Sequence, residues 1–477
     1  MSVEAATQTN KSAIASGLAS LRGALTGGLL VEGDPDYDKA RGVWNAMIDR
    51  HPLAIAVCND ADDVVSAIRF ARDHNLPVSI KAGGHNVAGH AVCDDGLMID
   101  LSQMRSVRVD PAEQRAHVAG GALWGDVDRE TLKWGLATPG GLISDTGVAG
   151  LTLSGGVGWL RSRYGLCIDN LVSMQVVTAN GDLVTASEES NPDLFWALRG
   201  GGGNFGVVVS FEFTLHPMNP TVMFCAPIYP IEAGPGPIRA WRDFLAGKND
   251  RIGSLVEFST VAESEDFPEE HWGKRCYTIA AVYVGDAGEG EKITMPLREL
   301  GDLVTDFSGQ MDYRDVQQLF DTLMPAGDFR CYWKCHFLDE LSDEMIDAAI
   351  ANAIAAPSNN TLSSLWNFGG ATAKVPADAT AFGDRSFGWM YSIDSVWPDA
   401  ADDESNIAFT RKAWDETRKH SQHGRLYLNF AGHGEDNESL VRDAFGRNYA
   451  RLAAIKAKYD PGNMFRFNQN IVPAGVH

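Results

Sequence analysis

The spacing of apolar residues along the chain predicts both helices and strands. Residues 60–74 carry apolar side chains three and four positions apart behind Asp60, a pattern typical of a capped amphipathic helix. Residues 207–215 alternate between apolar and polar, which predicts a strand with one buried face. Further patterns predict strands at 78–80 and 117–119, a helix over 122–134, and a two-residue hairpin turn at Asn180-Gly181 between strands at 176–178 and 183–184.

The composition and the predicted secondary structure of the chain change near residue 217. Glycine is dense before this point, whereas longer strands and long helices alternate from about 221 to 424. After 425, a short strand and a basic helix over 437–458 are predicted. We therefore expect a glycine-rich first domain, a middle α+β domain and a C-terminal stretch that returns to the first. The clearest middle elements are strands near 276–284 and 330–337 and a helix near 343–356.

Composition narrows the class of protein. The 477 residues exceed one ordinary domain, and 44% hydrophobic with 22% charged residues excludes a disordered chain. A net charge of −23 repels phosphodiester backbones and anionic lipid, so we expect no nucleic acid and no membrane partner. Seven scattered cysteines, no signal-peptide core and no apolar run of membrane-spanning length predict a cytoplasmic location.

Residues 201–206 match the dinucleotide-binding pattern G-x-G-x-x-G. That pattern binds pyrophosphate only where it follows a strand and opens a helix. Here it follows a predicted helix at 193–199 and opens a strand. The sequence context therefore argues against a Rossmann dinucleotide site.

A second glycine motif, Lys81-Ala82-Gly83-Gly84-His85-Asn86, follows the strand predicted at 78–80. Two adjacent glycines let the backbone close around a flat or anionic ligand, with the imidazole of His85 facing it. A plain turn with an incidental histidine is the alternative. His85, His90 and Cys93 lie close in sequence but lack paired ligand spacing, so we expect no metal site.

The third glycine-rich stretch spans residues 145–159. Its backbone N–H groups could form a nest for phosphate oxygens, whereas a flexible linker is the alternative. Interleaved valine and leucine favour packed backbone over a linker. The segment continues directly into Tyr164-Gly165-Leu166 and Asp169-Asn170.

These motifs, taken in order, resemble a known family. The GGH loop at 81–87 is followed by T-G-x-x-G-L-x-L-S-G-G-x-G at 146–158, Y-G-L-x-x-D-N at 164–170, D-L-F-W-A-L-R-G-G-G-x-N-F-G at 193–206, Y-x-N at 427–429, and 460–470. The set is similar to the berberine-bridge-enzyme-like branch of the FAD-linked oxidases with the vanillyl-alcohol oxidase/p-cresol methylhydroxylase (PCMH-type) fold, on its bacterial side. The resemblance implies a two-domain α+β fold. A discontinuous FAD-binding domain at 30–220 and 425–477 would enclose a substrate-binding domain at 221–424, built from an antiparallel sheet and helices.

The resemblance also assigns the cofactor and its contacts. FAD would be bound covalently through His85, whose attachment makes the flavin a better hydride acceptor. Ser144 stands where some members carry a second, cysteinyl link, and Cys167 falls elsewhere as a small buried residue, so one link is expected. The implied cofactor-binding residues are His85, Lys81, Ala82, Gly83, Gly84, Asn86, Val87, Thr146, Gly147, Gly150, Gly155, Gly156, Gly158, Asp169, Val208, Asn468 and Asn470.

The catalytic base is where the chain departs from the family pattern. The carbohydrate-oxidising branch ends its motif Y-x-N-Y, whereas this chain has Phe430 in the last place. Tyr427, Asp394 and Lys334 are the candidate catalytic residues, because a buried lysine can be neutral near pH 7 and act as a base. The alternatives are hydrogen bonding in the core for Tyr427 and Asp394, and a surface position for Lys334.

The expected activity is that of an FAD-dependent oxidase. Hydride would pass from a small substrate, aromatic or bearing an amine or alcohol, to the covalent flavin, and oxygen would be reduced to hydrogen peroxide. Aromatic residues of the middle domain, including Trp333 and Trp366, would suit a ring-bearing substrate. A flavin dehydrogenase with another electron acceptor, and a flavin-loaded protein without turnover, are the alternatives.

Overall fold

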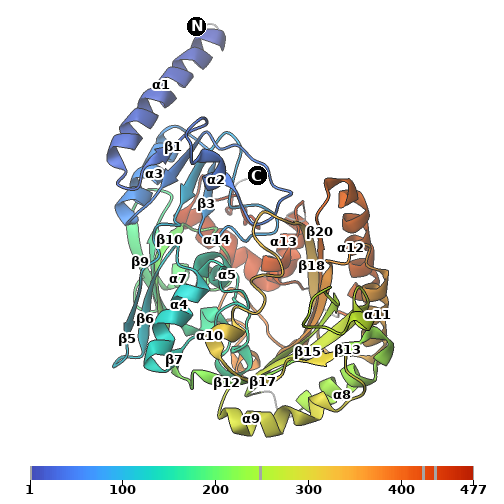
Figure 1. The fold of residues 1–477 in the computed structure, drawn as a ribbon. Coiled ribbons are helices and arrows are strands. Elements are labelled where there is room, and N and C mark those ends of the chain that lie inside the picture. Colours follow the sequence, from blue (N-terminus) through green and yellow to red (C-terminus); the bar gives the residue numbers. More distant parts are fainter. Residues whose placement is uncertain (1–2, 247–249, 422–424, 435–437, 476–477) are drawn as a thin grey trace.

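The computed structural model describes residues 3–246, 250–421, 425–434 and 438–475. Helix α1 (Val3–Ala24) projects from the body at the N-terminal end (Figure 1). The domain boundary predicted at 424, the chain end at 477 and the helix start predicted at 437 lie outside the described residues. The boundary at 220 stays a prediction, as do the domain divisions built on it.

A four-stranded sheet near the N-terminus has the order β1-β2-β4-β3. Strands β2, β4 and β3 are parallel, and β1 is antiparallel to β2. Helix α3 (Ala61–Asp73) packs on this sheet through Val64, Ala67 and Ile68, and the Asp60 carboxylate accepts its N-terminal cap hydrogen bond, as predicted. The strands are β1 (Leu29–Leu30), β2 (Ala54–Val57), β3 (Val78–Lys81) and β4 (Leu97–Asp100).

A second, antiparallel sheet has the order β5-β6-β10-β8-β9. From Val209 to Thr214 its central strand β10 alternates buried and half-buried residues, which confirms the predicted period of two. The strands are β5 (Val107–Asp110), β6 (Arg115–Ala119), β8 (Leu171–Val177), β9 (Leu183–Ser187) and β10 (Val207–Thr214). Strands β7 (Leu136–Ala137) and β11 (His216–Pro217) pair separately.

The β8–β9 hairpin differs in detail from the sequence prediction. Its strands pair up to Val177 and Leu183, so the connection is longer than the predicted two residues. Gly181 has φ +77° and its N–H donates to the Thr178 carbonyl oxygen. This is a type I turn completed by a left-handed glycine, which tolerates that conformation without steric cost.

The largest sheet belongs to the middle of the chain and has nine strands. Its long strands lie in the order β15-β14-β19-β20-β18, all antiparallel. The strands are β12 (Thr221–Cys225), β13 (Pro227–Pro230), β14 (Ile252–Thr260), β15 (Arg275–Tyr283), β16 (Thr305–Asp306), β17 (Gly309–Asp312), β18 (Arg330–Leu338), β19 (Leu362–Asn367) and β20 (Trp389–Trp397).

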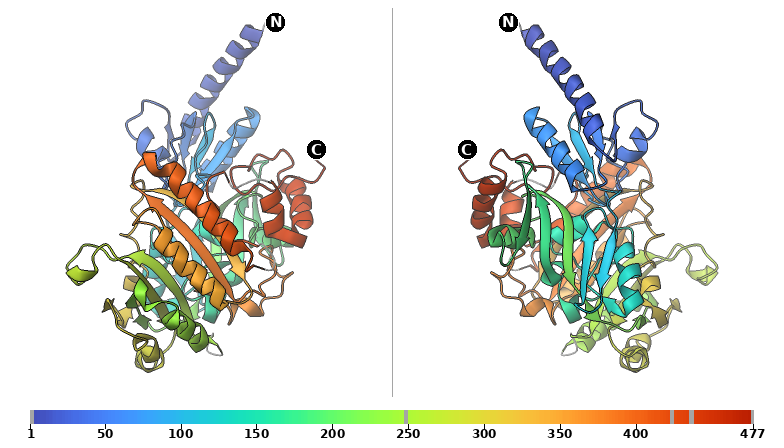
Figure 2. Two further views of the ribbon diagram at one scale, coloured as in Figure 1. Left: turned by 90° about the vertical axis from the view of Figure 1, so that its right-hand side faces the viewer. Right: turned by 90° about the vertical axis from the view of Figure 1, so that its left-hand side faces the viewer.

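Three helices cover one face of this sheet: α8 (Gly236–Leu245), α11 (Asp343–Ala355) and α12 (Asp403–Arg418). In Figure 2, left, α11 and α12 lie across the strands as amber and orange ribbons. Trp241, Met345 and Trp414 pack with the buried side chains of that face. Since the helices occupy this face, the opposite face is the one turned toward the first domain.

The remaining helices belong mostly to the glycine-rich part and the C-terminal stretch. None of the helices in the described part of the chain is long and apolar enough to cross a membrane. They are α2 (Tyr37–Arg41), α4 (Trp124–Thr131, extended by a 3-10 turn to Trp134), α5 (Val148–Leu153), α6 (Arg161–Tyr164), α7 (Pro192–Leu198), α9 (Ala287–Thr294), α10 (Tyr313–Val316), α13 (Glu438–Phe445) and α14 (Tyr449–Tyr459).

The C-terminal stretch packs against the glycine-rich part of the chain. The buried Lys456 ammonium donates to the carbonyl oxygens of Asn204 and Phe465 and pairs with Asp460 at 2.7 Å. Asn204 in turn donates to the Gln469 carbonyl oxygen. The single helix predicted over 437–458 is wrong, because Gly446 (φ +50°) opens a 3-10 turn that separates α13 from α14.

Arg161 joins the glycine-rich segment to the large sheet. Its fully buried guanidinium donates to the carbonyl oxygens of Gly158, Asn367 and Ser254, and to the Asn367 side chain. Burial lowers the pKa of Arg161 to about 9, and the hydrogen bonds compensate for the desolvated charge. These bonds tie the segment 158–161 to strands β14 and β19 of the large sheet.

Candidate active site

A cavity of about 320 Å³ lies between the glycine-rich segments and the uncovered face of the large sheet. One wall consists of backbone from 82–86, 146–154 and 202–208. The opposite wall carries side chains of β14, β18, β19 and β20, together with residues 427–430. Segment 465–469 contributes a further part of the lining. Residues far apart in sequence therefore line one cavity.

His85 stands on the lining, directly after β3. Its ring stacks on Trp44 with 5.7 Å between ring centroids and 20° between planes. The His85 Nε2 atom lies 3.1 Å from Asp145 Oδ1, within ion-pair distance. The stacked Trp44 ring therefore restricts the orientation of the imidazole, and the Asp145 oxygen lies close to it without forming a hydrogen bond.

The two glycine motifs touch each other behind His85. A Cβ atom on Gly83 would lie 2.3 Å from the Gly147 backbone nitrogen, and one on Gly147 would lie 2.4 Å from the Gly83 nitrogen. Neither backbone segment can move away from an added methyl group without displacing a wall of the cavity. This contact explains physically why both motifs need glycine at these positions.

Ten of the seventeen predicted cofactor-binding residues line the cavity. They are Ala82, Gly83, Gly84, His85, Asn86, Thr146, Gly147, Gly150, Val208 and Asn468. The other seven do not: Lys81, Val87, Gly155, Gly156, Gly158, Asp169 and Asn470.

Four of these seven have packing roles that the structure makes plain. Lys81 Nζ donates to the carbonyl oxygens of Ala40 and Gly42, and Asp169 forms a two-pronged ion pair with Arg385. A Cβ on Gly156 would lie 2.2 Å from Cys167 Sγ, and one on Gly158 would lie 1.8 Å from the Gly140 carbonyl oxygen. These four residues stabilise the glycine-rich part of the chain without lining the cavity.

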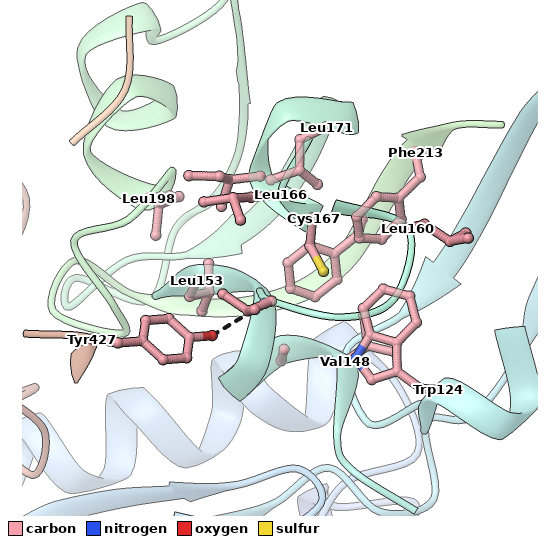
Figure 3. Packing of buried hydrophobic residues seen from close by; sticks show 14 of the residues in the cluster. Trp124, Val148, Leu153, Leu160, Leu166, Cys167, Leu171, Leu198, Phe213 and Tyr427 are labelled. Atoms are coloured by element: carbon pink, nitrogen blue, oxygen red, sulfur yellow. Dashed lines mark hydrogen bonds between the residues drawn. The ribbon is translucent and has the colours of Figure 1, made fainter. Parts of the chain in front are cut away.

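The two positions considered for a second flavin link also lie outside the lining. The Ser144 backbone N–H donates to Asp321 Oδ1 at 2.8 Å, and its hydroxyl donates to Asp321 Oδ2. Cys167 is fully buried among hydrophobic side chains, as Figure 3 shows. Burial raises the pKa of its thiol well above the ordinary value, which makes it inert.

Tyr427 lines the cavity, but its hydroxyl is engaged. The oxygen accepts hydrogen bonds from the Gly156 and Val157 backbone N–H groups and from the Asn429 side chain. Figure 3 shows one hydrogen bond of this hydroxyl as a dashed line. Burial raises the pKa of Tyr427 above its usual range, so the phenol stays protonated. Tyr427 therefore holds the turn at Gly156 and Val157 in place, and its protonated phenol is a poor proton acceptor.

The prediction of Lys334 as a catalytic base is wrong on geometry. Trp333 faces the cavity, and side chains of neighbouring strand residues point to opposite faces. The Lys334 ammonium accordingly lies 4.0 Å from the ring centroid of Trp414 on α12, on the helix-covered face. The sheet separates it from any ligand in the cavity.

Asp394 does face the cavity, from β20. Its Oδ2 accepts a hydrogen bond from Ser392 at 3.0 Å, and its Oδ1 is buried without a hydrogen-bond partner among the described residues. Burial, reinforced by the nearby Glu257, raises the pKa of Asp394 to about 8. A carboxyl group poised near neutrality and pointing into a cavity is a candidate general base.

Sequence reasoning missed Glu257 and Trp44, which both line the cavity. Glu257 lies on β14, and burial raises its pKa to about 7. The signal was present, since Glu257 is a lone acid inside an apolar strand pattern. Trp44 carries no such signal. The 201–206 segment, whose Rossmann interpretation was rejected, also lines the cavity through Gly202, Gly203 and Gly206.

The cavity wall fits a large flat cofactor such as FAD. A Cβ added to Gly150 or to Gly203 would meet no heavy atom within 4 Å, so both backbones face open space. Asn468 presents a buried side-chain oxygen without a hydrogen-bond partner among the described residues. No group of three potential metal ligands occurs in the described ranges of the chain.

Comparison with known proteins identifies the class. The FAD binding domain model matches residues 52–187, and the berberine and berberine like model matches residues 426–472. The chain belongs to the berberine-bridge-enzyme-like family and is an FAD-dependent oxidoreductase.

Two curated relatives match nearly the whole chain. The uncharacterized FAD-linked oxidoreductase YgaK of Bacillus subtilis strain 168 is 30% identical, covering 94% of this chain and 97% of its own. The (R)-6-hydroxynicotine oxidase of Paenarthrobacter nicotinovorans is also 30% identical, covering 94% and 98%.

Solved structures confirm the fold expected from the sequence. The crystal structure of 6-hydroxy-D-nicotine oxidase from Arthrobacter nicotinovorans superposes with a TM-score of 0.82 at 28% identity, over 94% of this chain and 98% of that one. Chitooligosaccharide oxidase superposes with a TM-score of 0.82 at 23% identity, over 97% and 100%. The α+β vanillyl-alcohol-oxidase-like fold is therefore confirmed.

Two glycine substitutions test the fit to FAD. Gly147→Ala should destabilise the protein by about 1–3 kcal/mol, because its new methyl group meets backbone. Gly150→Ala should leave folding stability unchanged or higher, since the methyl group enters open space from helix α5, yet it should lower FAD content. Chemical denaturation and the flavin-to-protein absorbance ratio measure the two effects. Full FAD content in Gly150→Ala would show that the cofactor lies elsewhere.

Proposed function

We propose that this protein is an oxidase that holds FAD covalently through His85 and takes hydride from a small aromatic substrate at a carbon next to an amine or alcohol. Molecular oxygen is the proposed electron acceptor and hydrogen peroxide the product. The observation that carries the proposal is one cavity lined by both His85 and Asp394, whose Oδ1 has no hydrogen-bond partner among the described residues. When bound, FAD would supply the two-electron acceptor.

Asp394 is the proposed proton acceptor. Hydride leaves an alcohol or amine carbon readily only as the O–H or N–H proton departs, so a base must stand close to that proton. Ser392 donates to one oxygen of Asp394 and itself accepts from the Trp366 indole N–H at 3.3 Å. This chain of hydrogen bonds holds the carboxyl group and leaves its other oxygen, Oδ1, without a hydrogen-bond partner among the described residues.

Aromatic side chains shape the space around Asp394. Phe430 contacts Trp333 edge-on with 5.4 Å between ring centroids, and Trp366 with 6.1 Å. The three rings exclude water and offer stacking partners to a ring-bearing substrate. Phe430 also removes the hydroxyl that sugar-oxidising relatives are expected to use, which favours activated aromatic donors over ordinary sugar alcohols.

A dehydrogenase with another electron acceptor is the second candidate. It shares every residue role above and differs only in how the reduced cofactor is reoxidised. Screening aromatic alcohols, cyclic amines and oligosaccharides for flavin bleaching without oxygen, then for peroxide on aeration, tests both steps. Bleaching by an aromatic donor with rapid peroxide release supports the oxidase. Bleaching without peroxide would establish the dehydrogenase, and no bleaching by any donor would contradict both.

The pH dependence of flavin reduction provides a separate test of the base. Since burial and Glu257 raise the pKa of Asp394 to about 8, its basic form accumulates only as the pH rises through 8. With a donor that does not ionise, the reduction rate should rise about tenfold per pH unit below 8 and level off above it. Anaerobic stopped-flow measurements from pH 6 to 10 give the profile. A flat wild-type profile would remove Asp394 from this role.

A further inference from the structure

The charged lining of the cavity has one sign. Among the described residues, two carboxyl groups line it, and neither lysine nor arginine does. Glu257 comes from β14 and Asp394 from β20, with β19 between them. Neighbouring strands are about 4.8 Å apart, so strands β14 and β20 stand roughly 10 Å from each other. Ser392 is the β20 residue level with Glu257, and Asp394 lies two residues further along β20. A small ligand group can lie between the two carboxyl groups.

Neither carboxyl group has a cationic partner among the described residues. Asp394 is only 7% exposed, and its Oδ1 has no hydrogen-bond partner among the described residues. The half-buried Glu257 carboxyl forms no hydrogen bond or ion pair with another described residue; its register partner across β19 is Ser364. Partly buried carboxylates without partners are unfavourable, and a cation in the cavity would satisfy both.

The surrounding rings add a second cation-attracting feature. Trp366 and Trp333 line the cavity beside the two carboxyl groups, and Phe430 contacts both rings. The faces of such rings attract ammonium groups, with tryptophan the strongest. Carboxylates and aromatic faces together are the chemistry that recognises a positively charged nitrogen, and they disfavour an anionic substrate group in this part of the cavity.

We propose that Glu257, acting with Asp394, makes this cavity selective for substrates that carry a cationic amine on a small aromatic skeleton. Glu257 is thus a specificity-determining residue that contacts the substrate. The inference rests on the proposed function only in taking this cavity as the substrate site. It concerns binding, which can be measured without turnover.

The test uses three aromatic probes of similar size and different charge: benzyltrimethylammonium, phenylacetamide and phenylacetate. Isothermal titration calorimetry on the purified flavin-containing protein should show the cation binding about tenfold or more tightly than the neutral amide, since one close charge pair in a shielded site contributes at least that factor. Phenylacetate should bind most weakly. Equal affinities for cation and amide, or no binding of the cation, would overturn the proposal.

Two variants assign the effect to Glu257. Glu257→Gln should lose most of the preference for the cation, whereas Glu263→Gln, the same change at an exposed site just beyond β14, should retain it. Glu257→Lys should reverse the order and favour phenylacetate. An unchanged cation preference in Glu257→Gln would contradict the role of Glu257. A cation preference in a protein that no donor reduces would instead leave this inference standing and overturn the proposed oxidase activity.

Discussion

Replacing His85 by alanine is expected to abolish covalent attachment of FAD. The imidazole is a nucleophilic group on the glycine-rich wall, and its ring is stacked on Trp44. Wild-type protein should carry the added mass of one FAD and show flavin fluorescence in acid after denaturing electrophoresis. His85→Ala should show neither, although it can still bind FAD reversibly.

His90→Ala is the matched control, because His90 is a second imidazole on the same lining. It should retain the covalent flavin. Peptide mapping of the wild type should place flavin on the His85 peptide alone, since Cys167 is buried behind the wall and Ser144 is held by Asp321. Flavin that leaves denatured wild-type protein, or flavin on a Cys167 peptide, would contradict the single histidyl link.

Replacing Asp394 by asparagine should slow flavin reduction by about 10²–10⁴-fold, the usual contribution of a general base. The change preserves the shape of the side chain and the hydrogen bond from Ser392, while it removes the ability of the side chain to accept a proton. Anaerobic single-turnover reduction by the preferred donor measures the rate. The flat pH profile expected of this variant separates loss of a base from loss of packing.

Lys334→Met supplies the control on the other face of the sheet. Its ammonium lies over Trp414 on α12, away from the cavity, so the reduction rate should stay within about threefold of wild type, a difference of less than 1 kcal/mol in activation free energy. A wild-type rate in Asp394→Asn would exclude Asp394 as the base. A large rate loss confined to Lys334→Met would contradict the side-chain placement on which the site rests.

Local patterns were sufficient for much of the fold and for the ligand-binding wall. The helix behind Asp60 and the alternation along β10 follow from periodicity, because burial of one face is encoded within a single element. The GGH loop and the 146–158 run identified the glycine-rich wall because their glycines, too, lie within short contiguous segments. Glycine is needed wherever backbone approaches backbone, as at Gly83 and Gly147.

The sequence by itself determined the fold class, the cofactor class and one wall of the site, since each depends on residues contiguous in the chain. Only the tertiary structure decided the opposite wall. Lys334 and Asp394 were both candidate bases in sequence, but strand alternation and the covering helix α12 turn Lys334 away from the cavity, whereas Asp394 lines it. Glu257 became a candidate only when β19 was seen to separate it from Asp394. Pairing between distant strands sets such neighbours, and no local pattern records it.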